Sequence, residues 1–159
     1  MRVISANLNG IRSASRKGFF DWLATTNADF VCVQELKAQD ADLDDTMRAP
    51  HGLTGHFHFA TKKGYSGVGL YTRETPDEVI IGFDNGGEFD NEGRYVEARF
   101  GNRSIISVYF TSGSNDDPAK QASKFRFLAT FMPHIAALKA AGRELIICGD
   151  VNIAHHEID

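Results

Sequence analysis

The sequence predicts a mixed α/β fold in which β-sheets are covered on their outer faces by helices. Two stretches that read as buried strands, residues 29–35 and 145–152, each follow a helical stretch, and a third opens the chain at residues 2–8. Residues 56–108 between them read as short strands joined by turns. Helix-then-strand units around antiparallel hairpins fit sheets packed against outer helices. At 159 residues, the chain is expected to form one domain, residues 1–159.

The first elements are predicted from apolar spacing. "RVISANL" (2–8) indicates a strand that starts almost at the first residue. Ser13 is expected to cap a helix running to about residue 26, because Phe19, Phe20 and Leu23 recur at helical spacing. "DFVCVQE" (29–35) indicates a continuous buried strand, and the acidic stretch 39–47 is expected to hold a short helix at most.

Short strands and one long helix follow. The strands are predicted at 56–61, 67–72, 78–83, 94–100 and 104–110, and the last two form a hairpin around Gly101. The helix is predicted from Pro118 to Ala141, with Gly142 as its stop. Pro133 inside it is expected to kink or weaken one turn. Its expected core face consists of Phe125, Leu128, Met132, Ile135 and Leu138.

Composition narrows the class of protein. The net charge of −4 argues against a bulk nucleic-acid binder but allows an enzyme that holds one phosphate through a metal. No apolar run approaches membrane-spanning length, so we expect no membrane partner. Two cysteines in apolar strands indicate buried, reduced thiols and a cytoplasmic location. A disulfide between them is the less favoured alternative.

Polar side chains stand where three of the predicted strands end. Asn7 ends the first, Glu35 ends the second, and Asp150 and Asn152 end the last. If the strands of Glu35 and Asp150 share one sheet, their ends bring the two carboxylates together. Mg²⁺ suits such a place, with Glu35 as ligand and Asp150 orienting or deprotonating a water. Asn152 can donate to a phosphoryl oxygen. The alternative is that these residues only cap strands.

The histidines suggest a competing zinc hypothesis. His56 and His58 would share one face of a strand, and His155 and His156 are neighbours. No third ligand has structural-zinc spacing, so solvated or packing histidines are the better interpretation. Residues 40–45, "DADLDD", lack the glycine and terminal glutamate of an EF-hand loop and are interpreted as a solvated acidic face.

Five blocks of sequence are similar to the signatures of a known family. They are "NLNGIR" (7–12), "VQELK" (33–37), "KKGYSGVGL" (62–70), "FDNEGR" (89–94) and "GDVNIAHHEID" (149–159). Their order resembles that of the exonuclease III family of apurinic/apyrimidinic endonucleases, within the endonuclease/exonuclease/phosphatase superfamily. The resemblance implies a four-layer αββα sandwich of the DNase I-like type and hydrolysis of DNA phosphodiesters with Mg²⁺ or Mn²⁺.

The resemblance also implies roles for individual residues. Glu35 matches the metal ligand, and Asn7 the residue that supports the metal and phosphate site. Asp150 matches the water-activating carboxylate and Asn152 a phosphate-binding amide. Tyr109 matches a tyrosine that faces the scissile phosphate.

Three further residues fall in blocks that face DNA in the family. They are Arg12, Tyr65 and Arg94. For two of them a structural role stays open: Arg94 as an ion-pair partner and Tyr65 as a packed ring. The implied partner is double-stranded DNA, particularly abasic sites and 3′ ends, and the implied complete enzyme is a monomer.

The expected function is therefore an abasic-site endonuclease with 3′-5′ exodeoxyribonuclease activity. A phosphodiesterase acting on RNA, inositol phosphates or lipid is the alternative, as is a catalytically incomplete fragment. The family continues beyond the last block with further strands, a second metal-site aspartate and an Asp-His pair. The resemblance thus implies the N-terminal part of a longer enzyme, and the isolated chain is expected to be marginally folded and inactive.

Overall fold

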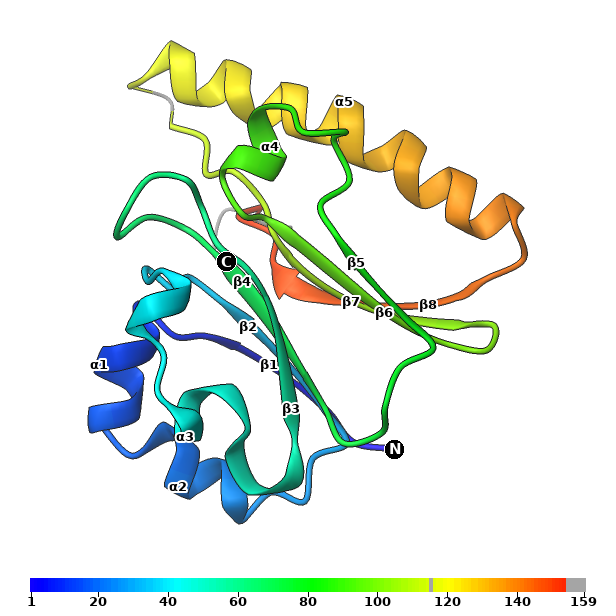
Figure 1. Cartoon of the computed structure of the whole chain (residues 1–159). Coiled ribbons are helices and arrows are strands. Elements are labelled where there is room, and N and C mark those ends of the chain that lie inside the picture. Colours follow the sequence, from blue (N-terminus) through cyan, green and yellow to red (C-terminus); the bar gives the residue numbers. More distant parts are fainter. Residues whose placement is uncertain (115, 154–159) are drawn as a thin grey trace.

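Two β-sheets packed face to face form the centre of the molecule (Figure 1). The structure is a computed structural model that describes residues 1–114 and 116–153. In this part of the chain, sheet A has the strand order β1-β2-β4-β3 and sheet B the order β5-β6-β7-β8. The strands are β1 (Val3–Asn7), β2 (Phe30–Gln34), β3 (Thr54–His58), β4 (Val68–Thr72), β5 (Glu78–Ile81), β6 (Tyr95–Phe100), β7 (Arg103–Tyr109) and β8 (Glu144–Asp150).

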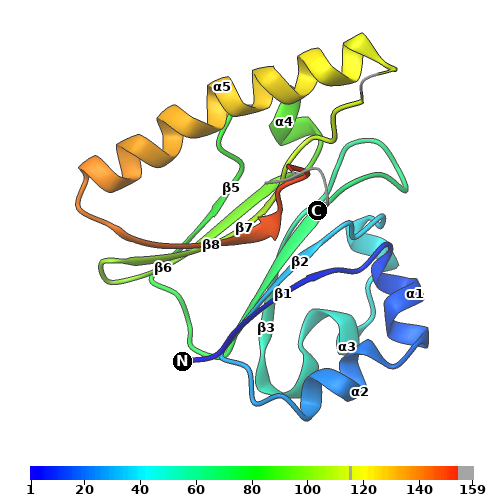
Figure 2. The same ribbon diagram turned by 180° about the vertical axis from the view of Figure 1, so that it is seen from behind.

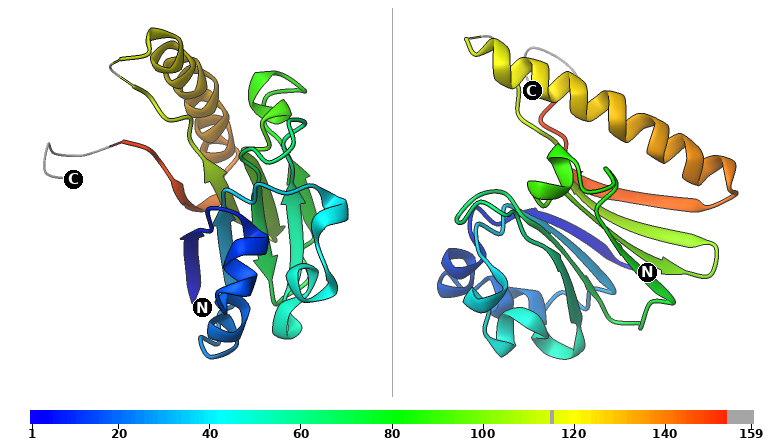
Figure 3. Two further views of the ribbon diagram at one scale, coloured as in Figure 1. Left: turned by 90° about the vertical axis from the view of Figure 1, so that its left-hand side faces the viewer. Right: turned by 45° about the horizontal axis from the view of Figure 1, so that its top comes forward.

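Helices cover the outer face of each sheet (Figures 1 and 2). Sheet A is covered by α1 (Ile11–Arg16), α2 (Phe19–Ala24) and α3 (Asp45–Arg48), with 3₁₀ turns at Asp40–Asp42 and Pro50–Gly52. Sheet B is covered by α4 (Glu88–Asn91) and the long α5 (Pro118–Ala140). The views in Figure 3 show α5 on the side of sheet B that faces away from sheet A. The expected four-layer αββα arrangement is confirmed.

Three apolar clusters hold these layers together. The middle cluster joins the sheets and includes Cys32 and Leu70 from sheet A and Val96 and Ile105 from sheet B. A second cluster lies between sheet A and its helices, and a third between sheet B and α5. Burial of a single Val, Leu, Ile or Phe side chain stabilises a fold by about 1.5–3 kcal/mol. Each helix is thus held by its sheet rather than by its own propensity.

The strand directions bring the C-terminal ends of four strands to the same end of the two sheets. β1 runs parallel to β2, with Asn7 opposite Gln34, and β7 runs parallel to β8, with Tyr109 opposite Asp150. The N-terminus lies at the other end of these strands (Figures 1 and 2). β2 and β8 lie in different sheets, so the shared sheet that was considered as a condition for joining their ends does not occur. Their ends meet because the two sheets pack face to face.

The first helical region is shorter and earlier than expected. One helix from Ser13 to about residue 26 was predicted, but α1 begins at Ile11 after Gly10, and Ser13 lies inside it. The stretch divides at Gly18, whose φ of 84° is left-handed and precedes α2. Glycine adopts this conformation without the penalty that a Cβ adds. The predicted apolar residues Phe19, Phe20 and Leu23 all lie in α2, and the turn at Gly18 separates them from α1.

The bounds of α5 agree with the prediction, starting at Pro118 and followed by a left-handed Gly142. The Asp117 side chain caps it by accepting the N–H groups of Ala119 and Lys120, at 3.1 and 3.2 Å. Pro133 lies inside the helix without ending it.

The predicted core face of α5 was partly wrong. Phe125 and Met132 are 61% and 56% exposed, whereas the buried residues are Phe127, Phe131, Ile135 and Leu138. The helix has apolar residues on neighbouring faces, so spacing alone selected a face rotated away from the one that packs on sheet B.

Strand β8 is less buried than its sequence predicts, because it lies at the edge of sheet B. Ile147 is 41% exposed. Both cysteines are free thiols, as expected, but only Cys32 is fully buried and Cys148 is half-buried.

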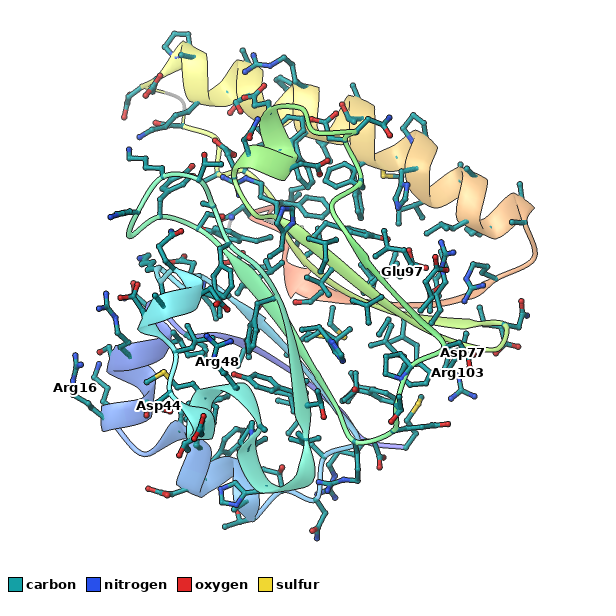
Figure 4. All side chains as sticks on the ribbon, viewed as in Figure 1. Arg16, Asp44, Arg48, Asp77, Glu97 and Arg103 are labelled. Carbon is teal, nitrogen blue, oxygen red and sulfur yellow. The ribbon has the colours of Figure 1, made fainter. Side chains whose placement is uncertain are left out.

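A buried carboxylate lies between sheet B and α5 (Figure 4). Glu97 is fully buried and accepts bonds from Arg99 (2.7 Å), Ser104 (2.5 Å) and the Tyr95 hydroxyl (2.9 Å). Burial raises the pKa of Glu97, but these hydrogen bonds and the Arg99 charge outweigh it and leave the pKa below its usual value. The carboxylate therefore stabilises the fold in its ionised form.

We expect Glu97→Gln to lower the free energy of unfolding at pH 7 by about 2–3 kcal/mol, because it breaks a buried, hydrogen-bonded pair. A lowered folded-state pKa contributes stability above the unfolded value of about 4.3, and this contribution is lost as the pH falls through the folded value. Urea unfolding of both proteins at pH 7 and pH 3.5 should thus show a difference that shrinks in acid.

Glu78→Gln is the matched control. Glu78 contacts the same Arg99 at 2.8 Å but is 58% exposed. Glu78→Gln should lower the free energy of unfolding by less than about 1 kcal/mol. If Glu97→Gln and Glu78→Gln lowered the free energy of unfolding equally, burial would not explain the contribution of Glu97.

Candidate active site

A polar cleft opens at the edge where β1, β2, β7 and β8 end. It has a volume of about 660 Å³ and includes the ends of strands from both sheets. Its lining residues are Ser5, Asn7, Gln34, Gly149, Asp150, Val151, Asn152 and Ile153. Three of the sequence-predicted site residues are among them.

One amide of the cleft lining, that of Asn7, contacts two carboxylates: Asp150, which also lines the cleft, and Glu35 next to it. The Asn7 Nδ2 group donates to Glu35 Oε1 at 2.9 Å and to Asp150 Oδ2 at 3.0 Å. Asn7 Oδ1 accepts the backbone N–H of Asn9 at 3.0 Å, which fixes the orientation of the amide. Glu35 and Asp150 thus meet at one amide, although their strands do not share a sheet. The two residues are separated by more than a hundred positions in the chain, so only the packing of the sheets unites them.

The backbone is shaped to present these side chains. Glu35 and Asn152 adopt left-handed φ values of 54° and 48°, which non-glycine residues rarely take and which are common at functional sites. A Cβ at Gly149 would overlap the backbone carbonyl oxygen of Val108. Only glycine fits there, and the chain can therefore bring Asp150 close to the end of β7.

Tyr109 completes the group around Glu35. Its hydroxyl donates to Glu35 Oε1 at 2.9 Å. Burial raises the pKa of Tyr109, and the bond to Glu35 and its negative charge raise it further. Tyr109 is therefore a neutral phenol near pH 7 and serves as a hydrogen-bond donor rather than as a base.

Glu35 is an anion under the same conditions. Its partial burial raises its pKa, but hydrogen bonds from Asn7, Lys37 and Tyr109 and the Lys37 charge outweigh burial, so the pKa lies below its usual value.

Asn152 lies two residues after Asp150, just beyond the end of β8. Its backbone N–H donates to Asp150 Oδ1 at 3.1 Å, and its Nδ2 donates to the Phe110 carbonyl at 2.9 Å. An amide has two N–H groups, so one remains for an oxygen in the cleft.

Arg94 is 3% exposed and lies behind the site. It contacts Glu92 at 2.5 Å and donates to the Tyr109 carbonyl and the Tyr65 hydroxyl, each at 3.0 Å. Its guanidinium carbon is 5.0 Å from the centre of the Tyr109 ring. The geometry matches the structural ion-pair alternative that the sequence left open. Arg94 orients Tyr109.

The other two predicted DNA-facing residues are more accessible. Tyr65 is half-buried, with the Lys62 ammonium 5.3 Å from its ring centre. The Arg12 side chain is 51% exposed on α1 and pairs with Asp42 at 3.3 Å. Arg12 is thus accessible on the surface while paired with Asp42, and Tyr65 is partly accessible beside Lys62.

Several residues that contact the site were not singled out from the sequence. Lys37 Nζ lies 2.6 Å from Glu35 Oε2, and Lys124 Nζ donates to the Asn152 carbonyl at 2.6 Å. Buried Gln34 lies 3.4 Å from the hydroxyls of Ser5 and Ser107 and so links the sheets. Lys37 stands only two positions after Glu35, so its place near the site could have been predicted from the sequence. The other contacts depend on tertiary packing.

The oxygens of Glu35 and Asp150 fit a hard divalent cation. Mg²⁺ uses one or two carboxylates and keeps several waters and phosphate oxygens as its other ligands. The described residues contain no cluster of three or more His, Cys, Asp or Glu side chains with metal-binding geometry. His56 instead contacts the Thr72 hydroxyl, and His58 the Tyr95 carbonyl. The pair at 155–156 lies outside the described residues.

The comparison with known proteins agrees with this description of the site. A model described as the Endonuclease/Exonuclease/phosphatase family matches residues 4–159. An exodeoxyribonuclease of Bacillus subtilis is 34% identical over the whole chain, and a DNA repair nuclease APEX1 of Danio rerio is 30% identical. The crystal structure of the Xenopus laevis APE2 catalytic domain superposes with a TM-score of 0.86 at 28% identity.

The chain matches only part of each of these proteins. It is covered completely in all three comparisons, but it spans 61% of the Bacillus relative, 51% of the Danio relative and 60% of the Xenopus chain. A 3′-5′ exonuclease of Neisseria meningitidis has the same TM-score at 23% identity and supports the fold alone.

Proposed function

The chain belongs to the endonuclease/exonuclease/phosphatase family, and from this premise we propose that its gene product is a metal-dependent DNA-repair nuclease. The proposed activities are incision at abasic sites and 3′-5′ exonucleolytic hydrolysis of DNA phosphodiester bonds. The observation that carries the proposal is the group at the cleft in which Asn7 joins Glu35 to Asp150 and Tyr109 donates to Glu35. The similarity to proteins named exodeoxyribonuclease and DNA repair nuclease supports DNA as the substrate.

In the proposed mechanism, Asp150 accepts a proton from the attacking water. Its Oδ1 and Oδ2 are each held by one donor, which fixes the carboxylate. The free N–H of Asn152 and the Tyr109 hydroxyl donate to phosphate oxygens, where negative charge builds up in the transition state. Tyr109 exchanges its bond to Glu35 for one to the phosphate.

Glu35 would hold Mg²⁺ or Mn²⁺ through its carboxylate, and Asn7 would support the metal site by donating its amide N–H groups to Glu35 and Asp150. When bound, the cation would supply Lewis-acid polarisation of a phosphoryl oxygen and would orient the substrate. Asn7 lies in contact with both carboxylates, so it also keeps them at a fixed separation when their charges repel.

The proposal includes duplex DNA as partner, with abasic sites and 3′ ends as preferred positions, and a monomeric enzyme. It also includes a cytoplasmic location, which the two free thiols support. The described residues include no helix long and apolar enough to cross a bilayer.

The test is hydrolysis of a duplex with one abasic analogue by the full-length gene product. Parallel reactions contain single-stranded RNA, an inositol phosphate and a phospholipid. Incision of the abasic duplex that needs Mg²⁺ or Mn²⁺ and stops in excess EDTA is the expected result. Faster hydrolysis of one of the other phosphodiesters would assign the chain to another branch of the family.

A pair of arginine variants should separate structural from DNA-contacting roles. Arg94→Met should lower the free energy of unfolding by about 3 kcal/mol, because it removes a buried charge that bonds three partly buried partners. Arg12→Met should change stability by less than about 0.5 kcal/mol but weaken DNA binding and reduce its salt slope by about one unit. Urea unfolding and DNA titrations at several salt concentrations measure both effects. Unchanged stability of the Arg94 variant would contradict its positioning role.

A further inference from the structure

Lys37 occupies the one oxygen of Glu35 that the protein leaves available for a cation. Oε1 accepts two hydrogen bonds, from Asn7 and Tyr109, both at 2.9 Å. These use the two lone pairs of that oxygen. Oε2 is contacted by Lys37 Nζ at 2.6 Å. In the absence of DNA, a metal ion that binds Glu35 must therefore approach Oε2 and meets a resident ammonium group there.

The backbone holds Lys37 in this position. Its φ of 47° is left-handed, and its N–H donates to the Ser66 carbonyl at 2.9 Å. Glu35 is fixed next to it, since its carbonyl accepts the Gly10 N–H at 2.8 Å. Two left-handed residues within three positions bring the side chains of Glu35 and Lys37 to the same side of the chain. Such strain persists only where the surroundings enforce it.

The ammonium group has a second acceptor to which it can move. Lys37 Nζ also donates to Asn9 Oδ1 at 2.5 Å. The Lys37 side chain is 38% exposed and the Glu35 side chain 16%, so the lysine can swing outward while Glu35 stays in place. Departure from Glu35 would leave Lys37 bound to Asn9 at the rim of the cleft.

We propose that Lys37 is a resident counter-ion of Glu35 that a divalent cation must displace. The ammonium neutralises the carboxylate in the metal-free protein and keeps the site assembled beside Asp150. Metal binding is then an exchange of one cation for another, because Mg²⁺ at about 2.0–2.1 Å from Oε2 would lie too close to an ammonium on the same oxygen. This inference rests on the proposed function, since it assumes that Glu35 binds a metal.

Titration calorimetry with MnCl₂ alone, without DNA, tests the exchange on the full-length gene product. Lys37→Met keeps the length of the side chain and removes the competitor, so Mn²⁺ should bind about tenfold more tightly than to the wild type. Lys37→Arg keeps the charge and should stay within about threefold of the wild type. Lys17→Met is the matched control, because Lys17 is an exposed lysine at the end of α1. It should leave the affinity unchanged.

NMR of the lysine ammonium groups gives a second reading that needs no variant to fold. Addition of MgCl₂ to the wild type should shift the Lys37 signal and leave that of Lys17 in place. Equal or weaker Mn²⁺ binding by Lys37→Met, or a Lys37 signal unmoved at saturating Mg²⁺, would overturn the exchange while leaving the proposed nuclease intact. No metal binding by the wild type or any variant would instead remove the metal site and both proposals with it.

Discussion

Replacing Asp150 by Asn is expected to lower kcat on an abasic duplex by about 10²–10⁴-fold, the range that general-base catalysis contributes. The variant keeps the size of the side chain but cannot accept the proton of the attacking water. Asp150 also accepts bonds from Asn7 and Asn152. An Asn at this position can accept only one of them through its oxygen, so a small loss of stability should accompany the loss of turnover.

Steady-state kinetics of the full-length gene product measure this effect. KM should change little, because the substrate is held by other groups. Asn152→Ala should lower kcat by about 10²–10³-fold through loss of one donor to the transition state. Glu144→Gln, at the exposed opposite end of the same strand, removes one negative charge and should have no effect. A change in KM alone for the Asp150 or Asn152 variant would show that the assigned role is wrong.

Replacing Glu35 by Gln should abolish most activity through loss of the metal. Gln keeps an oxygen for Asn7 and Tyr109, but it presents an uncharged amide where Lys37 now contacts Oε2. A hard cation binds a neutral amide more weakly than a carboxylate. We expect activity to fall by several orders of magnitude at about 1 mM Mg²⁺ and to recover in part as Mg²⁺ is raised.

Mn²⁺ calorimetry and activity across a series of Mg²⁺ concentrations test this prediction together. Glu74→Gln is the control, because Glu74 is an exposed carboxylate after β4, at the end of the strands away from the cleft. Undiminished Mn²⁺ affinity of the Glu35 variant, or full wild-type activity in excess EDTA, would rule out Glu35 as the metal ligand.

The sequence by itself predicted where polar groups stand on the chain. Asn7, Glu35 and Asp150 follow apolar strands, and strands are recognisable from runs of β-branched and aromatic residues. The start and stop of α5 were equally readable, since Pro118 and Gly142 act through their own backbone preferences. These are local properties, and each depends on a few neighbouring residues.

Properties that depend on distant contacts were decided only by the tertiary structure. Phe125 and Phe127 look alike in sequence, yet one faces solvent and the other packs on sheet B. Gly18 divides into two helices a stretch that the sequence predicted as one. For both, the free energy of packing against a sheet outweighs small differences in local propensity.

In the active site, too, the sequence indicated positions along the chain, and the tertiary structure decided the contacts. The sequence placed Glu35 and Asp150 at strand ends but left open whether their strands share a sheet. The structure joins both residues to Asn7 through two sheets packed face to face. The sequence could not show that Arg94 is buried behind Tyr109 or that Lys37 lies on Glu35 Oε2. Charged side chains take their roles from burial and from the partner that compensates their desolvation. Both are set by segments far apart in the chain, and so only the folded structure fixes them.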